Sequence, residues 1–255
     1  MSTPRPGRLS PASLRRDADA PVALARLGRV GYLEAWELQR ALVAERQRGR
    51  ARDALLLLEH PPVYTLGRRA ERTNVLFDAD QLARRGIEVI EVDRGGDVTY
   101  HGPGQLVGYP ILALASVRGV VDYVRALEDV LLRALSGLGV RAERVPGYTG
   151  VWVGEQKIAA IGVRVASGGV TSHGFALNVT PDLTDFTGIV PCGITDRGVC
   201  SLASLGVDAD LAAVAAQVTT AFADVFAATL IDTPRDRLLP AEDAAQPPAP
   251  HPKAC

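Results

Sequence analysis

The organisation of this chain is read most directly from Arg94-Gly95-Gly96-Asp97-Val98-Thr99-Tyr100-His101-Gly102-Pro103-Gly104-Gln105, a glycine-rich segment between two apolar runs. Alternating residues 87–92 before it and apolar residues 105–114 after it predict a strand on each side. Its glycines leave room for a ligand to approach the backbone closely. Its spacing matches neither the dinucleotide fingerprint nor the Walker loop. It is therefore a candidate ligand-binding loop of another kind, with a long hairpin connection as the alternative.

Outward from this segment, residue periodicity predicts helices and strands in a mixed order. Helices are expected at 31–47, 78–85, 120–138 and 208–230, the last with Asp208 as its N-cap. Further strands are expected at 53–59, 149–153, 157–165 and 170–179. Helices alternate with strands early in the chain, whereas strands follow one another in its middle. This order predicts an α/β domain with a mixed sheet flanked by helices.

Length and composition predict one globular domain. The chain has 255 residues, 47% of them hydrophobic, and a formal net charge of −1. We expect a flexible arm at 1–20, a catalytic domain at 21–233 and a disordered Pro/Ala-rich tail at 234–255. The charge gives no reason to expect binding to nucleic acid or to a membrane surface. The first residues lack the apolar run of a secretory signal, so we expect a cytoplasmic protein.

Cysteine usage predicts reduced thiols rather than a disulfide scaffold, because the chain has three cysteines in all. Cys192 stands between Pro191 and Gly193, where a thiolate can attack a carbonyl while neighbouring amides hold the oxyanion. A buried, inert thiol is the alternative for Cys192, and it is the reading that we favour for Cys200. The spacing of cysteines and histidines does not support a metal site.

Lys157 is the second chemical candidate, because this chain uses arginine almost everywhere else. Of its 28 basic residues, only Lys157 and Lys253 are lysine, and Lys253 lies in the tail. An arginine-biased composition with one lysine left by chance is the alternative. An amine at a strand edge can exchange protons at accessible pH, whereas a guanidinium cannot.

His60 and Asn178 are weaker candidates, each with a structural alternative. His60 follows a predicted buried strand, where it can reach a site or merely stabilise a turn. Asn178 ends the run His173-Gly174-Phe175-Ala176-Leu177-Asn178, where it can close a pocket or satisfy local backbone groups.

Together these segments resemble the lipoyl(octanoyl) transferase family. The resemblance rests on the glycine-rich segment at 94–105, Lys-Ile-Ala at 157, His-Gly-Phe-Ala-Leu-Asn at 173 and Pro-Cys-Gly at 191. The motifs agree in order and spacing from about residue 30 to about residue 230. The segment at 94–105 is the longest and most specific of these motifs.

The resemblance implies a mixed sheet like that of biotin and lipoate protein ligases. It implies transfer of an octanoyl group from octanoyl-acyl carrier protein to a lysine of a lipoyl domain. The acceptors would be the lipoyl domains of 2-oxoacid dehydrogenase complexes and the glycine cleavage H protein. It also implies a catalytic Cys192–Lys157 pair. The implied substrate-binding residues are Arg94, Gly95, Gly96, Asp97, Val98, Thr99, Tyr100, His101, Ala160, Ile161, Gly162, Gly174, Phe175 and Ala176.

The chemistry of this transfer requires no cofactor, because a thioester is exchanged for a thioester and then for an amide. Lys157 would favour the Cys192 thiolate and accept the proton of the incoming amine. We expect His101 and Tyr109 to position the donor rather than to transfer protons. An ATP-dependent lipoate or biotin ligase is the alternative, since it shares the loop and the lysine but needs no cysteine. A non-catalytic protein that binds acyl carriers or lipoyl domains is a third possibility.

Overall fold

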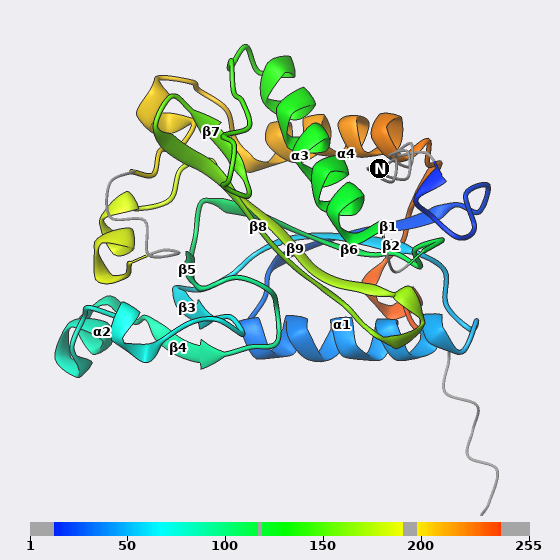
Figure 1. The fold of residues 1–255 in the computed structure, drawn as a ribbon, viewed down its shortest axis with the longest axis horizontal. Coiled ribbons are helices and arrows are strands. Elements are labelled where there is room, and N and C mark those ends of the chain that lie inside the picture. The colour runs from blue at the N-terminus through cyan, green and yellow to red at the C-terminus, as the bar shows by residue number, and fades with distance from the viewer. Residues whose placement is uncertain (1–12, 117–118, 191–197, 241–255) are drawn as a thin grey trace, which may run out of the picture.

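The computed structural model describes residues 13–116, 119–190 and 198–240, which form two sheets with helices on both faces of the larger one (Figure 1). In the described chain the larger sheet has seven strands in the order β10-β1-β2-β6-β9-β8-β7. These strands are β10 (Leu230–Asp232), β1 (Val22–Arg29), β2 (Ala54–Glu59), β6 (Gln105–Ile111), β9 (Thr171–Asn178), β8 (Gln156–Val165) and β7 (Val151–Val153).

Strand directions make this sheet mixed, as the sequence predicts. Strand β1 pairs in parallel with both β10 and β2. The pairs from β2 through β6, β9 and β8 to β7 are antiparallel. The expected α/β class and mixed sheet are therefore confirmed.

Helices cover the sheet on both faces. Helix α1 (Tyr32–Gln47) lies on one face, and α3 (Val120–Gly137) and α4 (Leu211–Phe226) lie together on the other (Figure 1). The core under α3 and α4 includes Tyr123, Phe175 and Phe222. The expected helix at 31–47 is confirmed, although its apolar residue Leu33 is 52% exposed. Its buried face is formed instead by positions such as Ala35 and Leu42.

The second sheet is small and lies beside the first. In the described chain it has the order β4-β3-β5, formed by β4 (Glu88–Glu91), β3 (Val63–Leu66) and β5 (Val98–His101). Helix α2 (Ala79–Arg85) leads into β4. A capping box between Asp78 and Gln81 begins α2, and Gly86 at φ 62° ends it, which explains why its position was predictable.

Sequence periodicity missed four strands, namely β1, β3, β5 and β10. It also placed the start and end of α4 wrongly. Asp210, not Asp208, caps this helix by accepting a hydrogen bond from the backbone of Ala213. The helix ends at Phe226 rather than near Leu230, because Ala227 adopts a left-handed conformation at φ 47°. The chain after it pairs with β1 as β10.

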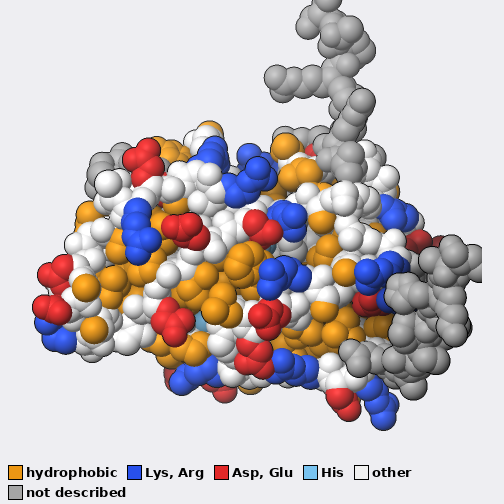
Figure 2. Space-filling model, turned by 90° about the horizontal axis from the view of Figure 1, so that it is seen from below, with side chains coloured by type: hydrophobic (Ala, Val, Ile, Leu, Met, Phe, Trp, Pro, Cys, Tyr) orange, Lys and Arg blue, Asp and Glu red, His pale blue; other side chains and the backbone are white. Residues whose placement is uncertain are grey.

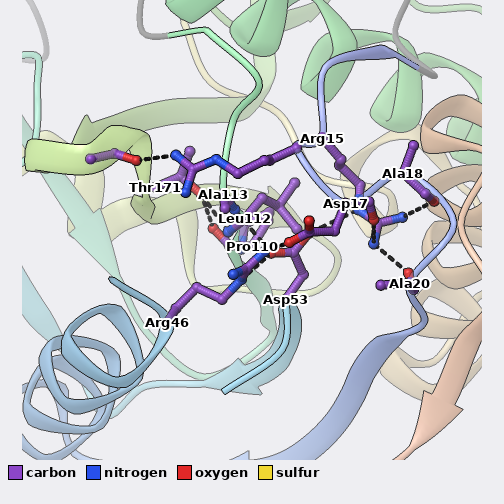
Figure 3. A network of polar contacts seen from close by, with 12 residues as sticks. Arg15, Asp17, Ala18, Ala20, Arg46, Asp53, Pro110, Leu112, Ala113 and Thr171 are labelled. Atoms are coloured by element: carbon purple, nitrogen blue, oxygen red, sulfur yellow. Dashed lines mark hydrogen bonds and ion pairs between the residues drawn. The ribbon is translucent and has the colours of Figure 1, made fainter. Parts of the chain in front are cut away.

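Residues 13–20, which the sequence assigns to an arm, lie against the domain in the structure. Leu14 is buried, and the Arg15 side chain enters a buried ion-pair network (Figure 3). At its centre, Asp53 accepts hydrogen bonds from Arg15 Nε at 2.9 Å, Arg46 Nε at 2.8 Å and the backbone of Ala113 at 2.9 Å. One carboxylate therefore joins the N-terminal segment to α1, β2 and the chain after β6.

The outer surface over α1 and the small sheet mixes apolar groups with charges of both signs (Figure 2). Leu33 and Leu76 contribute exposed apolar area to the surface, being 52% and 57% exposed.

Among the described residues, no helix is long and apolar enough to cross a membrane. No group of three or more His, Cys, Asp or Glu side chains in the described part of the chain is arranged to hold a metal ion.

Candidate active site

A cavity of about 420 Å³ lies over β8 and β9, beneath the glycine-rich segment. It gathers most of the site residues that the sequence predicts. Those that line it are Arg94, Gly95, Gly96, Asp97, Val98, Thr99, His101, Lys157, Ala160, Ile161, Gly162, Gly174, Phe175 and Ala176. Residues far apart in the chain thus meet at one place.

Tyr100 is the exception among these described residues, because it does not line the cavity. Its side chain is 1% exposed and packs in the core of the small sheet. Its hydroxyl donates to Asp185 Oδ2 at 2.7 Å. Tyr100 therefore packs on the face of β5 that points away from the cavity. Alternation along β5 turns its neighbours Thr99 and His101 the other way, toward the cavity.

Small residues on two paired strands make room for the cavity. Ala160 lies opposite Ala176, and Gly162 lies opposite Gly174 in the β8–β9 register. A Cβ atom at Gly162 would lie 3.0 Å from the backbone oxygen of Gly95. The glycine-rich segment can thus approach β8 closely, and the backbone of Gly95 donates to the Val163 carbonyl at 2.9 Å.

Arg94 fixes the start of the glycine-rich segment to the small sheet. It is 6% exposed, and its Nη2 donates to the Thr65 carbonyl at 2.6 Å. Its Nε donates to Thr65 Oγ1 at 3.2 Å. Asp97, further along, accepts from Asn74 Nδ2 at 3.1 Å and from the backbone of Val98 at 2.6 Å. These contacts hold the segment at a defined position over the cavity.

Lys157 lies at the opposite end of the cavity, at the start of β8. Its ammonium nitrogen is 4.8 Å from the centre of the Trp152 ring, a geometry in which the ring face attracts a cation. Its backbone N–H donates to Gly198 at 2.9 Å, and its carbonyl accepts from Cys200 at 3.1 Å. Residues 198–200 are therefore hydrogen-bonded directly to the strand that carries the lysine.

Cys192 and Cys255 lie outside the described residues. Cys200 is 1% exposed, and burial raises the pKa of its thiol to about 11. At neutral pH that thiol is protonated and a poor nucleophile. The structure thus agrees with the expectation that Cys200 is inert.

Asn178 and Gln105 join the lysine end of the cavity to His101. Asn178 Nδ2 donates to the Cys200 carbonyl at 2.9 Å, and its Oδ1 accepts from Gln105 Nε2 at 3.0 Å. Gln105 Oε1 then faces His101 Nδ1 at 3.2 Å, which makes Nδ1 the protonated ring nitrogen. Burial lowers the pKa of His101 well below its usual value. Asn178 therefore both lines the cavity and satisfies a backbone carbonyl.

A group of aromatic and imidazole rings lies at the other end of the cavity, where the sequence had indicated His60, His101 and Tyr109. Tyr32 and His173 also line the cavity there. His60 lies behind Tyr109, with Nδ1 2.7 Å from the Val30 carbonyl and Nε2 2.7 Å from the Tyr109 hydroxyl. His60 thus holds the Tyr109 side chain in place but does not itself line the cavity. Tyr32 carried no signal of its own beyond being an aromatic residue at a helix start.

Comparison with known proteins shows which protein family this chain resembles. Residues 31–223 match the model of the lipoyl protein ligase A/B catalytic domain. An octanoyltransferase from Acidobacterium capsulatum is 59% identical over 193 residues, covering 70% of this chain and 78% of that protein. One from Chloroflexus aurantiacus is 54% identical over 205 residues, covering 79% and 92%.

Solved structures show the same fold at low identity. A putative lipoate protein ligase from T. acidophilum has a TM-score of 0.68 and 17% identity, covering 84% of this chain and 89% of that one. A lipoate-protein ligase A bound with ATP has a TM-score of 0.67 and 17% identity, with the same coverage. The expected likeness to lipoate protein ligases is confirmed at the level of fold.

Proposed function

This chain belongs to the octanoyltransferase family of the lipoate/biotin protein ligase superfamily, and from that we propose that it moves an octanoyl group from octanoyl-acyl carrier protein to the lysine of a lipoyl domain through a Cys192 thioester. Octanoyl transfer in lipoate biosynthesis follows from the family. The donor, the acceptors and the Cys192–Lys157 pair are the proposed part.

The observation that carries the proposal is the cavity that runs from Lys157 over small residues of β8 and β9 to buried rings. Its floor at Ala160 and Ala176 is apolar and presents no charged group. An acyl chain placed along this floor gains about 0.8 kcal/mol for each methylene removed from water. Its carbonyl end would then lie beside the lysine.

The first step exchanges one thioester for another. The Cys192 thiolate attacks the carbonyl carbon of the donor, a bond from sulfur to carbon forms, and the carrier thiolate leaves. The Lys157 ammonium favours the Cys192 thiolate by its charge. Because both bonds are thioesters, this step is nearly isoenergetic and needs no ATP.

The second step forms an amide and is downhill. The lysine amine of the lipoyl domain attacks the acyl carbon, the Cys192 thiolate leaves, and the amine nitrogen gives up a proton. Lys157 is neutral at this stage, because the leaving carrier thiolate took its proton in the first step, and it accepts the proton of the amine. Contact with the Trp152 ring face limits where the Lys157 amine can lie.

Intact mass measurement after incubation with octanoyl-acyl carrier protein alone tests the first step. The wild type should gain one octanoyl mass that hydroxylamine removes, and Cys192→Ala should gain none. Cys200→Ala is the matched control, since it removes a thiol outside the proposed chemistry and should still be acylated. An adduct mapped to Cys200 or Cys255 would contradict the proposal, as would labelling that requires ATP.

Single-turnover kinetics with a lipoyl domain separates the two roles of Lys157. Lys157→Arg keeps a charge but cannot accept a proton, so it should form some acyl-enzyme and then transfer it slowly. Lys157→Met should be slow in both steps. Transfer by Lys157→Arg at close to the wild-type rate would make Lys157 an electrostatic partner only.

A further inference from the structure

The cavity has an open end and a closed end. Lining residues near Lys157 are exposed at Gly147, Thr149 and Gly198, and Arg69 is exposed beside the glycine-rich segment. At the closed end, Tyr32, Tyr109 and His173 are only 5%, 3% and 1% exposed. Lys157 lies at the open end, because its backbone is hydrogen-bonded to Gly198. A chain entering beside Lys157 therefore runs toward the three buried rings.

The length of this path is set by the strands beneath it. Asn178, beside the lysine end, and His173, at the closed end, are five residues apart on β9. At about 3.3 Å per residue their Cα atoms are roughly 16 Å apart. The side chains that line the two ends of the cavity occupy part of that length, so the space left for a chain is shorter. The rings of the closed end therefore limit how far an extended chain can reach.

Hydrogen bonds and ring contacts join these side chains into one wall, made of Tyr32, His60, Tyr109 and His173. The Val30 carbonyl fixes the proton of His60 on Nδ1, so His60 Nε2 accepts from the Tyr109 hydroxyl at 2.7 Å. The Tyr32 ring packs against the His60 ring, with the ring centres 5.0 Å apart.

The wall continues from Tyr32 to His173, which is anchored on two sides. The Tyr32 hydroxyl lies 3.5 Å from His173 Nδ1, and His173 Nε2 donates to Asp93 Oδ1 at 2.8 Å. The His173 backbone N–H donates to Gln39 of α1 at 2.7 Å. His173 holds a left-handed φ of 56° in this position, a conformation that side-chain-bearing residues adopt mainly when their surroundings fix it.

Such a wall resists displacement more than an aliphatic one does. Leucine or valine side chains can repack around a slightly longer ligand at modest cost. Moving Tyr109 or Tyr32 instead breaks a buried hydrogen bond and leaves its partner unsatisfied, which costs far more than the bond contributes. The wall is therefore a fixed stop rather than a compliant surface.

The geometry points to the wall of Tyr32 and Tyr109, held by His60 and His173, as the stop that sets the longest acyl chain this enzyme accepts. This inference rests on the proposed function, since it takes the reactive carbonyl to lie beside Lys157. It assigns the two tyrosines a role in specificity and none in proton transfer.

Measuring transfer from acyl carrier protein loaded with 6-, 8-, 10- and 12-carbon chains tests the wall. Tyr109→Leu opens space at its centre. Two further methylenes become buried, so the kcat/KM for the 10-carbon donor relative to the 8-carbon donor should rise roughly tenfold. Tyr123→Phe is the matched control, because Tyr123 is also fully buried but does not line the cavity. It should keep the wild-type ratio.

A double variant protects the experiment against misfolding. Tyr109→Leu leaves His60 Nε2 without its donor, whereas adding His60→Leu removes that nitrogen and leaves the Val30 carbonyl without its donor instead. Urea unfolding of both variants shows which of them is folded well enough for the measurement. The double variant should show the same shift toward longer chains. A folded Tyr109→Leu or double variant with the wild-type length profile would overturn the inference, as would an equal shift in Tyr123→Phe.

Binding of free 8-, 10- and 12-carbon fatty acids, followed by calorimetry, separates this inference from the proposed function. In the wild type, affinity should rise with chain length among the shorter acids, and the 12-carbon acid should bind more weakly than that trend predicts. Tyr109→Leu should remove this break in the trend. If the wild type transfers no acyl group but shows the break, the function is wrong and the wall stands. If transfer occurs and neither the transfer profile nor binding responds to Tyr109→Leu, the wall is wrong and the function stands.

Discussion

Lowering the pH should destabilise this protein through its buried histidines, and His60 allows the size of the effect to be worked out. His60 is 0% exposed, and burial lowers its pKa from 6.5 to about 4. Between these two values the unfolded chain binds a proton at this position and the folded protein does not. Stability is therefore complete above about pH 6.5 and falls as the pH drops toward 4.

The difference of about 2.5 in pKa corresponds to a loss on the order of 3 kcal/mol from His60 alone. Burial lowers the pKa of His101 and of His173 as well, so both add to the loss in the same direction. A loss of this size is a large part of the total stability of an ordinary domain.

Urea unfolding at intervals from pH 7.5 to pH 4 measures this loss, with His60→Gln as the comparison. Glutamine does not titrate, and its amide group offers the same donor to Val30 and the same acceptor to Tyr109. The variant should lose about 3 kcal/mol less than the wild type across the window, while other titrating groups affect both proteins equally. The same pH dependence in both proteins would refute the reasoning, and so would a wild type that gains stability on acidification.

Three further predictions concern single side chains outside the reaction. Asp53→Asn should cost about 3–5 kcal/mol in urea unfolding, because it leaves the buried Arg15 guanidinium without a carboxylate and Arg46 with only the half-exposed Asp17; a loss under 1 kcal/mol would show that the network relaxes. Cys200 should resist iodoacetamide at pH 7.5 until the protein unfolds, since burial raises its pKa to about 11, and Cys200→Ala should cost on the order of 1 kcal/mol while leaving turnover unchanged; rapid labelling of the native protein would contradict this. Gly104→Ala should unfold at clearly lower urea, because Gly104 has φ +85° and a Cβ there would lie 2.5 Å from the backbone of Thr180; an unchanged midpoint would show that the chain can shift there.

The helices show what local sequence can determine. Helices α1, α2, α3 and α4 all form close to where periodicity and capping residues place them, because helical hydrogen bonds are local. Yet periodicity did not find that Leu33 faces solvent or that α4 stops at Phe226. Both depend on which surface the helix meets and on where the chain must turn to pair with β1.

The short strands show what the sequence alone does not determine. Strand β5 lies within the glycine-rich segment, and it becomes a strand only because Val98–His101 finds β3 as its antiparallel partner. Strand β10 pairs with a strand about 200 residues earlier in the chain. Strand pairing satisfies backbone groups between distant segments, so four residues carry too little local signal to predict it.

The residues of the site also fall into two groups, those that the sequence indicates and those that only the folded structure brings together. The glycine-rich segment, Lys157 and the Pro-Cys-Gly setting of Cys192 are chemical signals in the sequence itself, so the family and its candidate residues could be read from them. That Tyr100 turns away from the cavity while Tyr32 meets His173 across 141 positions was decided only by the tertiary structure. Side-chain direction on a strand and contact between distant elements follow from packing, and packing is a property of the whole folded chain.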